Sequence, residues 1–206
     1  MADLTTAGPA TLRRSPLTHL HDRMNVASTG GAHRLTLREW PFITMVSLRV
    51  DPASPAAHRI GSVLGSPLPQ HYGETSGHGP HTALWLGPDE WLVVSHTDAP
   101  RLVTELTDAL AFEPGSAVDV SANRTTLELG GPAARHVLEK ACPLDLHPRS
   151  FGPGQAVATT VGPVPVLLWQ TDDEPVYRLL PRASFADHLA RRLLDGMREF
   201  QIPGAP

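Results

Sequence analysis

The chain has 206 residues, of which 41% are hydrophobic and 18% charged, with a formal net charge of −4. This acidic balance argues against a nucleic-acid surface, and no stretch approaches the roughly 18 apolar residues of a membrane span. A single cysteine permits no internal disulfide, and the N-terminus lacks the apolar core of a signal peptide, so we expect a cytoplasmic protein.

Residues 1–33 show little hydrophobic periodicity and many Ala, Thr, Gly and His residues. This composition predicts an N-terminal arm that can become ordered on a partner. The length is sufficient for one sizeable core or two small fused lobes. We therefore expect a single two-lobed domain over residues 34–200 and a short tail over residues 201–206.

Alternating or continuous apolar residues predict strands at 35–39 and 42–50. Ser54 and Pro55 are typical of a helix start, because serine caps the helix and proline is tolerated in its first turn. Gly65 is the expected residue after the helix ends. Further along the chain, the pattern predicts a loop at 66–82, strands at 82–86 and 91–95, and a helix that begins near residue 98.

The central stretch from Ala117 to Gly154 combines two short strands, a turn and a helix. Val118 and Val120 predict the first strand, and Leu127 and Leu129 predict the second. Pro132 follows two glycines and is expected in the first helical turn. The helix is indicated by an apolar stripe at i, i+3, i+4 and i+7, formed by Ala134, Val137, Leu138 and Ala141.

The C-terminal part reads as strands at 156–161, 164–169 and 176–180, followed by a helix that Ser184 and Asp187 would start as a weak capping box. Residues 84–106 and 168–189 each show the order strand, acidic turn, strand, helix. Trp85 and Glu90 have the same spacing as Trp169 and Glu174. This repeat predicts an α+β fold of two ferredoxin-like strand–strand–helix lobes.

Three blocks carry a resemblance to a known family: VDVSANRTTLELGGPAARHVLEKACPLDLHPRSFGPG at 118–154, LWLGPDEWL at 84–92, and YRLL with SFADHL at 177–189. They resemble the gamma subunit of heterotetrameric bacterial sarcosine oxidases, and the likeness runs from Ser15 to about Gly196. More remotely, Asp-x-Ser, Gly-Pro-x-Ala and a later Pro-Gly resemble the folate-binding aminomethyltransferases. Both resemblances imply the same two-lobed α+β fold.

The first resemblance implies a non-catalytic subunit of an enzyme complex that oxidises sarcosine to glycine. Formaldehyde, or 5,10-methylenetetrahydrofolate when tetrahydrofolate is present, and hydrogen peroxide are the implied products. It further implies that FAD, FMN, NAD, tetrahydrofolate and zinc are held by partner subunits, with the alpha subunit as principal partner beside beta and delta. The alternative is a stand-alone folate-binding module related to the aminomethyltransferases, in which Asp119 is the one candidate carboxylate.

Aminomethyltransferase chemistry itself is not expected. In those enzymes a Gly-Gly-x-x-Asp-Asp segment supplies the catalytic acid, and the corresponding stretch at 161–166 contains no carboxylate. Because an apolar side chain cannot transfer a proton, we expect no catalytic residue there.

Other reactive residues have plainer interpretations. Cys142 could act as a nucleophile with His136 or His147, but a lone cysteine is more often a small buried hydrophobe. The histidines of the 66–82 loop suggest zinc, yet their spacing matches no usual ligand pattern, so a polar surface loop is favoured over a metal site formed by His71, His78, His81 and Glu74.

Gly130 and Gly131 precede a helix and could hold a phosphate, although a tight turn is favoured because the dinucleotide spacing is missing. Asp119 and Ser121 are expected to hold a turn through side-chain to backbone hydrogen bonds. Arg124 could pair with a carboxylate of another chain or remain in solvent. We therefore assign no catalytic, cofactor-binding or metal residue. Among the tryptophans, Trp85 and Trp169 are expected in the core and Trp40 at an interface.

Overall fold

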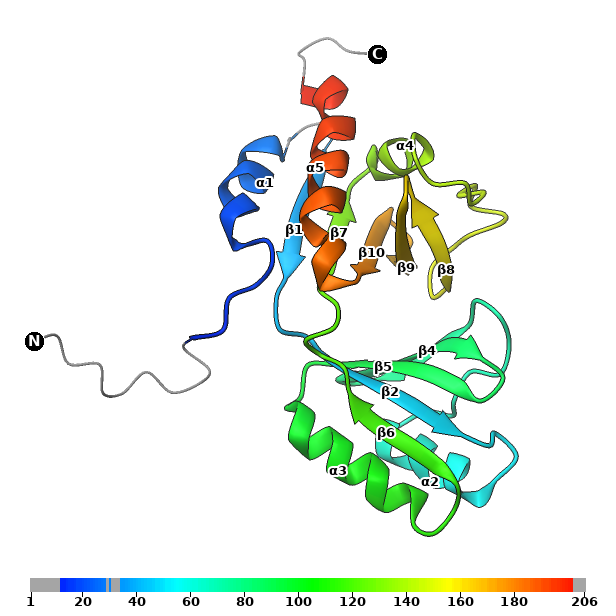
Figure 1. Ribbon diagram of the computed structural model, residues 1–206. Helices are drawn as coiled ribbons and strands as arrows, with labels where there is room; N and C mark the ends of the chain where they lie inside the picture. Colours follow the sequence, from blue (N-terminus) through cyan, green and yellow to red (C-terminus); the bar gives the residue numbers. More distant parts are fainter. Residues whose placement is uncertain (1–11, 29, 31–33, 202–206) are drawn as a thin grey trace, which may run out of the picture.

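The structure is a computed structural model that describes residues 12–28, 30 and 34–201. It contains two lobes, each with a five-stranded antiparallel sheet, stacked one above the other in Figure 1. Lobe one consists of η2 (Thr18–Leu20), α1 (His21–Ala27), β1 (Thr36–Trp40), β7 (Thr126–Gly130), α4 (Ala134–Glu139), β8 (Ala156–Val161), β9 (Val164–Asp172), β10 (Val176–Pro181), η4 (Ala183–Phe185), α5 (Ala186–Met197) and η5 (Arg198–Gln201).

Lobe two lies between β1 and β7 in the chain. It consists of β2 (Thr44–Val50), α2 (Pro55–Leu64), β3 (Thr75–His78), β4 (His81–Gly87), β5 (Glu90–Ser95), α3 (Ala99–Leu110) and β6 (Gly115–Asp119).

The two lobes share one topology. Their strand orders are β6-β2-β5-β4-β3 and β1-β7-β10-β9-β8, and the chain visits corresponding positions in the same sequence. The strand order differs at one edge strand only. In lobe two this strand is β6, the last strand of the lobe, whereas in lobe one it is β1, which precedes the other strands of that lobe. The α+β fold of two ferredoxin-like lobes, predicted from the repeat and the resemblance, is therefore confirmed.

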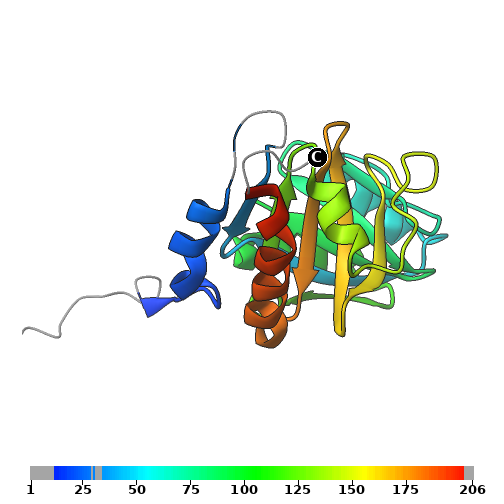
Figure 2. The same cartoon turned by 90° about the horizontal axis from the view of Figure 1, so that it is seen from above.

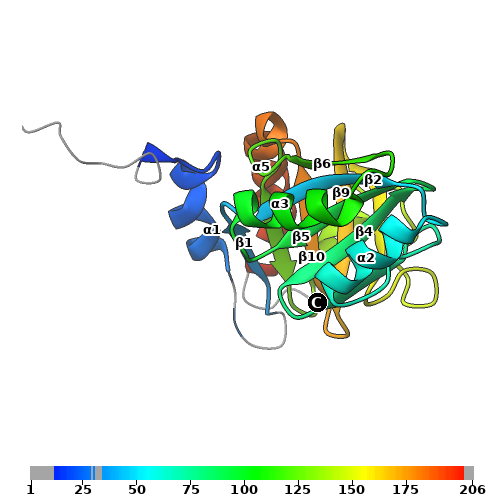
Figure 3. The ribbon, with the colours of Figure 1, turned by 90° about the horizontal axis from the view of Figure 1, so that it is seen from below.

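The sheets face each other, and the helices cover their outer faces. Successive residues of β5 alternate between the two sides: Trp91 and Val93 pack toward α2 and α3, whereas Leu92 and Val94 pack toward the other sheet. β9 does the same, with Leu168 toward the helices and Leu167 toward lobe two. Figure 2 shows α1, α5 and α4 next to one another over lobe one, and Figure 3 shows α2 and α3 over lobe two.

The lobes are linked at two places. At the first, the chain itself crosses between them, because β1 leads into β2 and β6 leads into β7. At the second, the amide of Ala156 in lobe one donates to the carbonyl of Gly73 in lobe two at 2.9 Å. The Thr75 hydroxyl also donates to the carbonyl of Gly154 at 2.6 Å. These links tie two non-adjacent parts of the chain across the interface.

Local helix signals are confirmed in α2. Ser54 is its N-cap and accepts a hydrogen bond from the amide of Ala57, Pro55 is its first residue, and Gly65 ends it in the left-handed conformation with φ 77°. The helix α5 differs, because it begins at Ala186 after the short turn η4 and has no side-chain cap. The predicted capping box of Ser184 and Asp187 is therefore wrong.

The prediction of an arm over residues 1–33 is wrong for the part that forms η2 and α1. Leu17, Leu20, Met24 and Ala27 are buried in the core of lobe one, because their spacing places them on one face of consecutive helical turns. Residues 1–11 of the predicted arm and 202–206 of the predicted tail lie outside the described residues.

Two further details differ from the sequence-based expectation. The predicted loop at 66–82 contains the edge strand β3, whose polar and glycine residues pair with β4. The matched spacing of Trp85 and Trp169 does not mark equivalent positions, since Trp85 packs toward the helices of lobe two while Trp169 lies between the sheets. Among the described residues, no helix has the length and apolar character needed to cross a membrane.

Candidate functional site

Asp119 and Ser121 form a turn at the end of β6. The Asp119 carboxylate accepts hydrogen bonds from the Ser121 amide at 2.9 Å and from its hydroxyl at 2.5 Å. The Ser121 oxygen in turn accepts from the amide of Met45 at 3.0 Å. The predicted structural role of Asp119 and Ser121 is confirmed. Asp119, the carboxylate proposed to face a pteridine, is hydrogen-bonded to Ser121.

Tetrahydrofolate, which the fold of the aminomethyltransferases implies, finds no matching site between the sheets. The facing surfaces are filled by apolar side chains, including Met45, Leu84, Leu167 and Trp169. A pteridine ring would have to displace part of this apolar packing. The stretch at 161–166, where the relatives carry their catalytic acid, forms the hairpin turn between β8 and β9 at its outer end.

Cys142 is buried in the core of lobe one, at 8% exposure. The polar atom near its sulfur is the Thr159 hydroxyl, at 3.9 Å, rather than a ring of His136 or His147. A thiol needs an adjacent base or cation to become a nucleophile. The structure therefore supports the interpretation of Cys142 as a buried hydrophobe.

The histidines of the 66–82 region do not converge. The His71 ring contacts the Glu74 carboxylate at 3.1 Å in an exposed turn, whereas His81 bonds to the Ser95 hydroxyl at 2.9 Å. His78 lies opposite His81 in the β3–β4 hairpin. Within the described ranges, no three His, Cys, Asp or Glu side chains are placed to hold one metal ion.

Gly131 has a packing role. Its φ is 113°, and a β-carbon at this position would lie 2.0 Å from the Arg34 carbonyl oxygen, so only glycine permits the close approach of the chain before β1. The helix α4 that follows has six residues. The tight-turn interpretation of Gly130 and Gly131 is supported.

A buried ion-paired cluster lies on the inner face of lobe one, beside the apolar interface. The Glu128 carboxylate, with 8% of its side chain exposed, accepts from Arg38 at 2.5 Å and from Arg178 at 3.2 Å. Both guanidiniums also lie over the Trp40 ring, 4.6 and 5.2 Å from its centroid. The Glu128 carboxylate is thus engaged by two side chains of neighbouring strands and holds β1, β7 and β10 together. No sequence pattern indicates this cluster, since β1, β7 and β10 are far apart in the chain.

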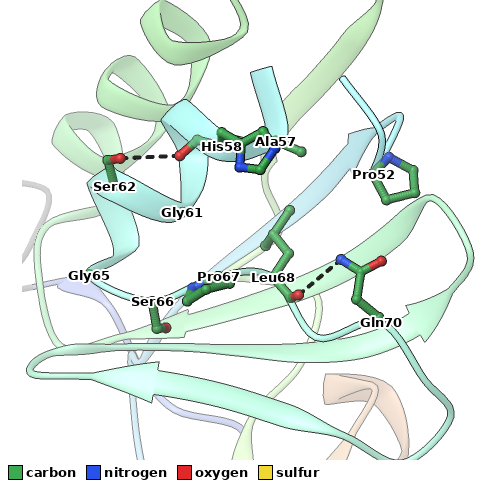
Figure 4. A pocket seen from close by; sticks show the side chains of 10 residues that line it. All are labelled: Pro52, Ala57, His58, Gly61, Ser62, Gly65, Ser66, Pro67, Leu68 and Gln70. Carbon is green, nitrogen blue, oxygen red and sulfur yellow. Dashed lines mark hydrogen bonds between the residues drawn. The ribbon is translucent and has the colours of Figure 1, made fainter. Parts of the chain in front are cut away.

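A groove of about 470 Å³ runs between α2 and the segment that follows it. Figure 4 shows the small residues Ala57 and Gly61 of α2 facing Pro67 and Leu68, with His58 and Gln70 at its rim. Its lining is mostly apolar or backbone. No pair of acid and base residues meets there.

A second hollow of about 280 Å³ lies where the chain passes between the lobes. It is lined by Arg13, Arg14, Phe42 and Arg124, together with Ser121 and Thr125. Arg124 is half-buried and donates from Nη1 to the Leu180 carbonyl at 2.8 Å. Burial, and secondarily the positive charge of Arg182, lowers the pKa of Arg124.

Comparisons with known proteins match this architecture. The family model for the sarcosine oxidase gamma subunit matches residues 49–199. The chain is 47% identical to sarcosine oxidase subunit gamma from an Arthrobacter species over 98% of each chain, and 45% identical to that from Corynebacterium sp. strain U-96 over 97% of each. The chain belongs to the sarcosine oxidase gamma subunit family.

Solved structures agree with this membership in the gamma subunit family. A chain of the heterotetrameric sarcosine oxidase from Corynebacterium sp. U-96, in complex with pyrrole 2-carboxylate, superposes with a TM-score of 0.89 at 44% identity, covering 95% of this chain and 100% of that one. Aminomethyltransferase T from Bartonella henselae gives a TM-score of 0.64 at 16% identity, covering 89% of this chain and 57% of that one. The second likeness shows the fold alone, and the resemblance drawn from the sequence is confirmed.

Proposed function

We propose that this gamma-family chain is a non-catalytic subunit of a heterotetrameric sarcosine oxidase, in which it stabilises the assembly by docking. The observation that carries the proposal is the near full-length likeness to a chain of such a heterotetramer. The placement of the candidate groups supports it further. Asp119, Cys142 and Glu128 each make contacts within the chain that hold the fold.

In this complex the reaction converts sarcosine to glycine, with hydrogen peroxide and either formaldehyde or 5,10-methylenetetrahydrofolate as products. We place FAD, FMN, NAD, tetrahydrofolate and zinc in the other subunits, with the alpha subunit as principal partner and beta and delta as the remaining ones. We also place the assembly in the cytoplasm, and we keep residues 34–200 as one two-lobed domain to which η2 and α1 of the N-terminal segment contribute core residues.

The proposal is tested by expressing the chain with and without the other three subunits. We expect the tagged chain to co-purify with them in equal amounts, and we expect the isolated chain to bind no flavin and turn over no sarcosine. Flavin bound in a one-to-one ratio, or turnover by the isolated chain, would overturn the proposal.

Calorimetry with tetrahydrofolate separates this function from a folate-binding module. We expect no heat of binding from the isolated chain. Micromolar binding that Asp119→Ala abolishes would favour the module, because Asp119 is the candidate carboxylate for the pteridine.

A further inference from the structure

Four arginines and one phenylalanine gather where the chain passes between the lobes, and we call this surface the crossover patch: Arg13, Arg14, Phe42, Arg124 and Arg182. Three of the arginines and Phe42 line the 280 Å³ hollow. Arg182 lies next to it, because its backbone bridges that of Arg124. The patch is a concentration of positive charge on a chain whose formal net charge is −4.

The four arginines of the crossover patch lack carboxylate partners among the described residues. Several other arginines are paired with glutamates, as Arg38, Arg59 and Arg178 are, and the crossover patch differs in gathering four without such a partner on one surface. Two cations of the patch lie close together, and the positive charge of Arg182 contributes, after burial, to lowering the pKa of Arg124. Such an arrangement is unfavourable in the isolated subunit and becomes favourable when an anion lies between the guanidiniums.

The carboxylates nearest to the patch are already engaged. Glu39 lies beneath the hollow with its side chain fully buried, and it accepts hydrogen bonds from Ser15, from Thr125 at 2.6 Å and from the His21 ring at 2.8 Å. Asp119, at the adjacent turn, accepts from Ser121. Among the described residues neither carboxylate forms an ion pair with the patch arginines. Apart from Nη1 of Arg124, which donates to the Leu180 carbonyl, their N–H groups remain available to an outside group.

Phe42 provides an apolar contact at the edge of the patch. It has φ 61°, a left-handed conformation that costs a non-glycine residue about 1–2 kcal/mol, and it is 47% exposed. The Arg13 guanidinium lies 4.7 Å from its ring centroid. The strained backbone leaves about half of this large aromatic side chain exposed to solvent, which points to a further contact outside this chain.

We propose that the crossover patch docks an acidic segment of another subunit of the complex. Carboxylates of that segment bind the forks of Arg124 and Arg182, and an apolar side chain packs on Phe42. Arginine and aromatic side chains together are the composition of energetically dominant interface sites. This inference rests on the proposed docking function and adds to it the place and the chemistry of the contact.

The test uses the four-subunit complex with the exposed patch residues changed. Arg13→Gln with Arg182→Gln, and separately Phe42→Gly, are each expected to lower the affinity of this subunit for the other three about tenfold or more. The arginine variant is also expected to reduce the salt dependence of assembly. Phe42→Gly relieves the left-handed strain, and circular dichroism of the isolated variant checks that the subunit remains folded. Arg149→Gln and Phe112→Ala, which change exposed residues away from the patch, are the matched controls.

A photo-crosslinker placed at Phe42 then identifies the occupant. Cross-links to an Asp- or Glu-rich segment of another subunit support the proposal. Cross-links to a second copy of this chain, saturation of the patch by inorganic phosphate without loss of assembly, or full affinity in both variants would each overturn it. If only the assignment of the crossover patch is wrong, the wild-type chain still co-purifies with its partners. If the docking function itself is wrong, the wild-type chain does not co-purify with them.

Discussion

Individual side chains in this protein connect segments that are distant in sequence. The Glu39 carboxylate joins the N-terminal turn, the end of β1 and the start of β7 through Ser15, His21 and Thr125. Asp187 performs a similar role at the surface, where it contacts His19 of η2 at 2.7 Å and Arg191 of its own helix at 2.8 Å. Both carboxylates hold the first described segment onto lobe one.

The Asp187 contact predicts a pH-dependent stability. Arg191 and then His19 lower the pKa of the Asp187 carboxyl from 3.8 to about 2. Because the folded-state pKa is the lower one, this stabilisation is present above pH 4 and is lost as the pH falls toward 2. We expect Asp187→Asn to reduce the free energy of unfolding at pH 6 by less than about 1 kcal/mol, since the carboxylate is exposed and screened.

Urea titrations of wild type and variant between pH 6 and pH 2 measure this effect, and the difference between them should vanish near pH 2. Asp195→Asn changes an exposed aspartate of the same helix that pairs with Arg198, without contact to η2, and serves as the control. A difference for Asp187→Asn that stays constant over the whole pH range would contradict the assignment.

Residue-scale features were predictable where the signal is local. Ser54 and Gly65 act on atoms within four residues, so their types alone indicate the helix ends. Asp187 was assigned to the start of α5, but its hydrogen-bonding partner His19 is 168 residues away in sequence. The same holds for Glu128, whose two arginines come from strands that only the sheet order brings together.

At the scale of elements, α1 is part of the core. Met24 is 1% exposed against lobe one, whereas Val26, two residues later on the same helix, is 86% exposed. We expect Met24→Ala to lower the free energy of unfolding by about 2–5 kcal/mol, since it leaves a cavity, and Val26→Ala to change it by less than about 0.5 kcal/mol. Chemical denaturation of the isolated chain measures both, and equal small effects would show that α1 does not belong to the folding unit.

Elements were missed where apolar residues are few or the register is set by a turn. The strand β3 is Thr-Ser-Gly-His and gains its place through backbone pairing with β4, which no hydrophobic pattern reports. The face of the sheet on which each tryptophan lies depends on the hairpin that follows it. Trp85 lies two residues before Gly87, which pairs with Glu90, whereas Trp169 lies three residues before Asp172, which pairs with Val176. One residue of difference in strand length after each tryptophan places the two rings on opposite faces.

At the scale of the molecule, the two lobes bury a common interface. The inner face of each sheet contributes four buried apolar side chains, and a backbone hydrogen bond from Ala156 to Gly73 links the lobes at the edge away from the chain crossings. The sequence-derived repeat indicated two lobes but not which faces meet, since β4, β5 and β9 are apolar on both sides. The outer faces take helices from their own lobe, which leaves the inner faces to each other.

This shared interface predicts that the lobes unfold together. Leu84 of β4 is fully buried between the sheets. Leu84→Ala is expected to lower the free energy of unfolding by about 2–5 kcal/mol while keeping one cooperative transition, because the weakened interface still couples the lobes. Tryptophan fluorescence and far-ultraviolet circular dichroism should report the same urea midpoint. Separate midpoints already in the wild type would show instead that each lobe folds on its own and that the interface adds little to the stability of either.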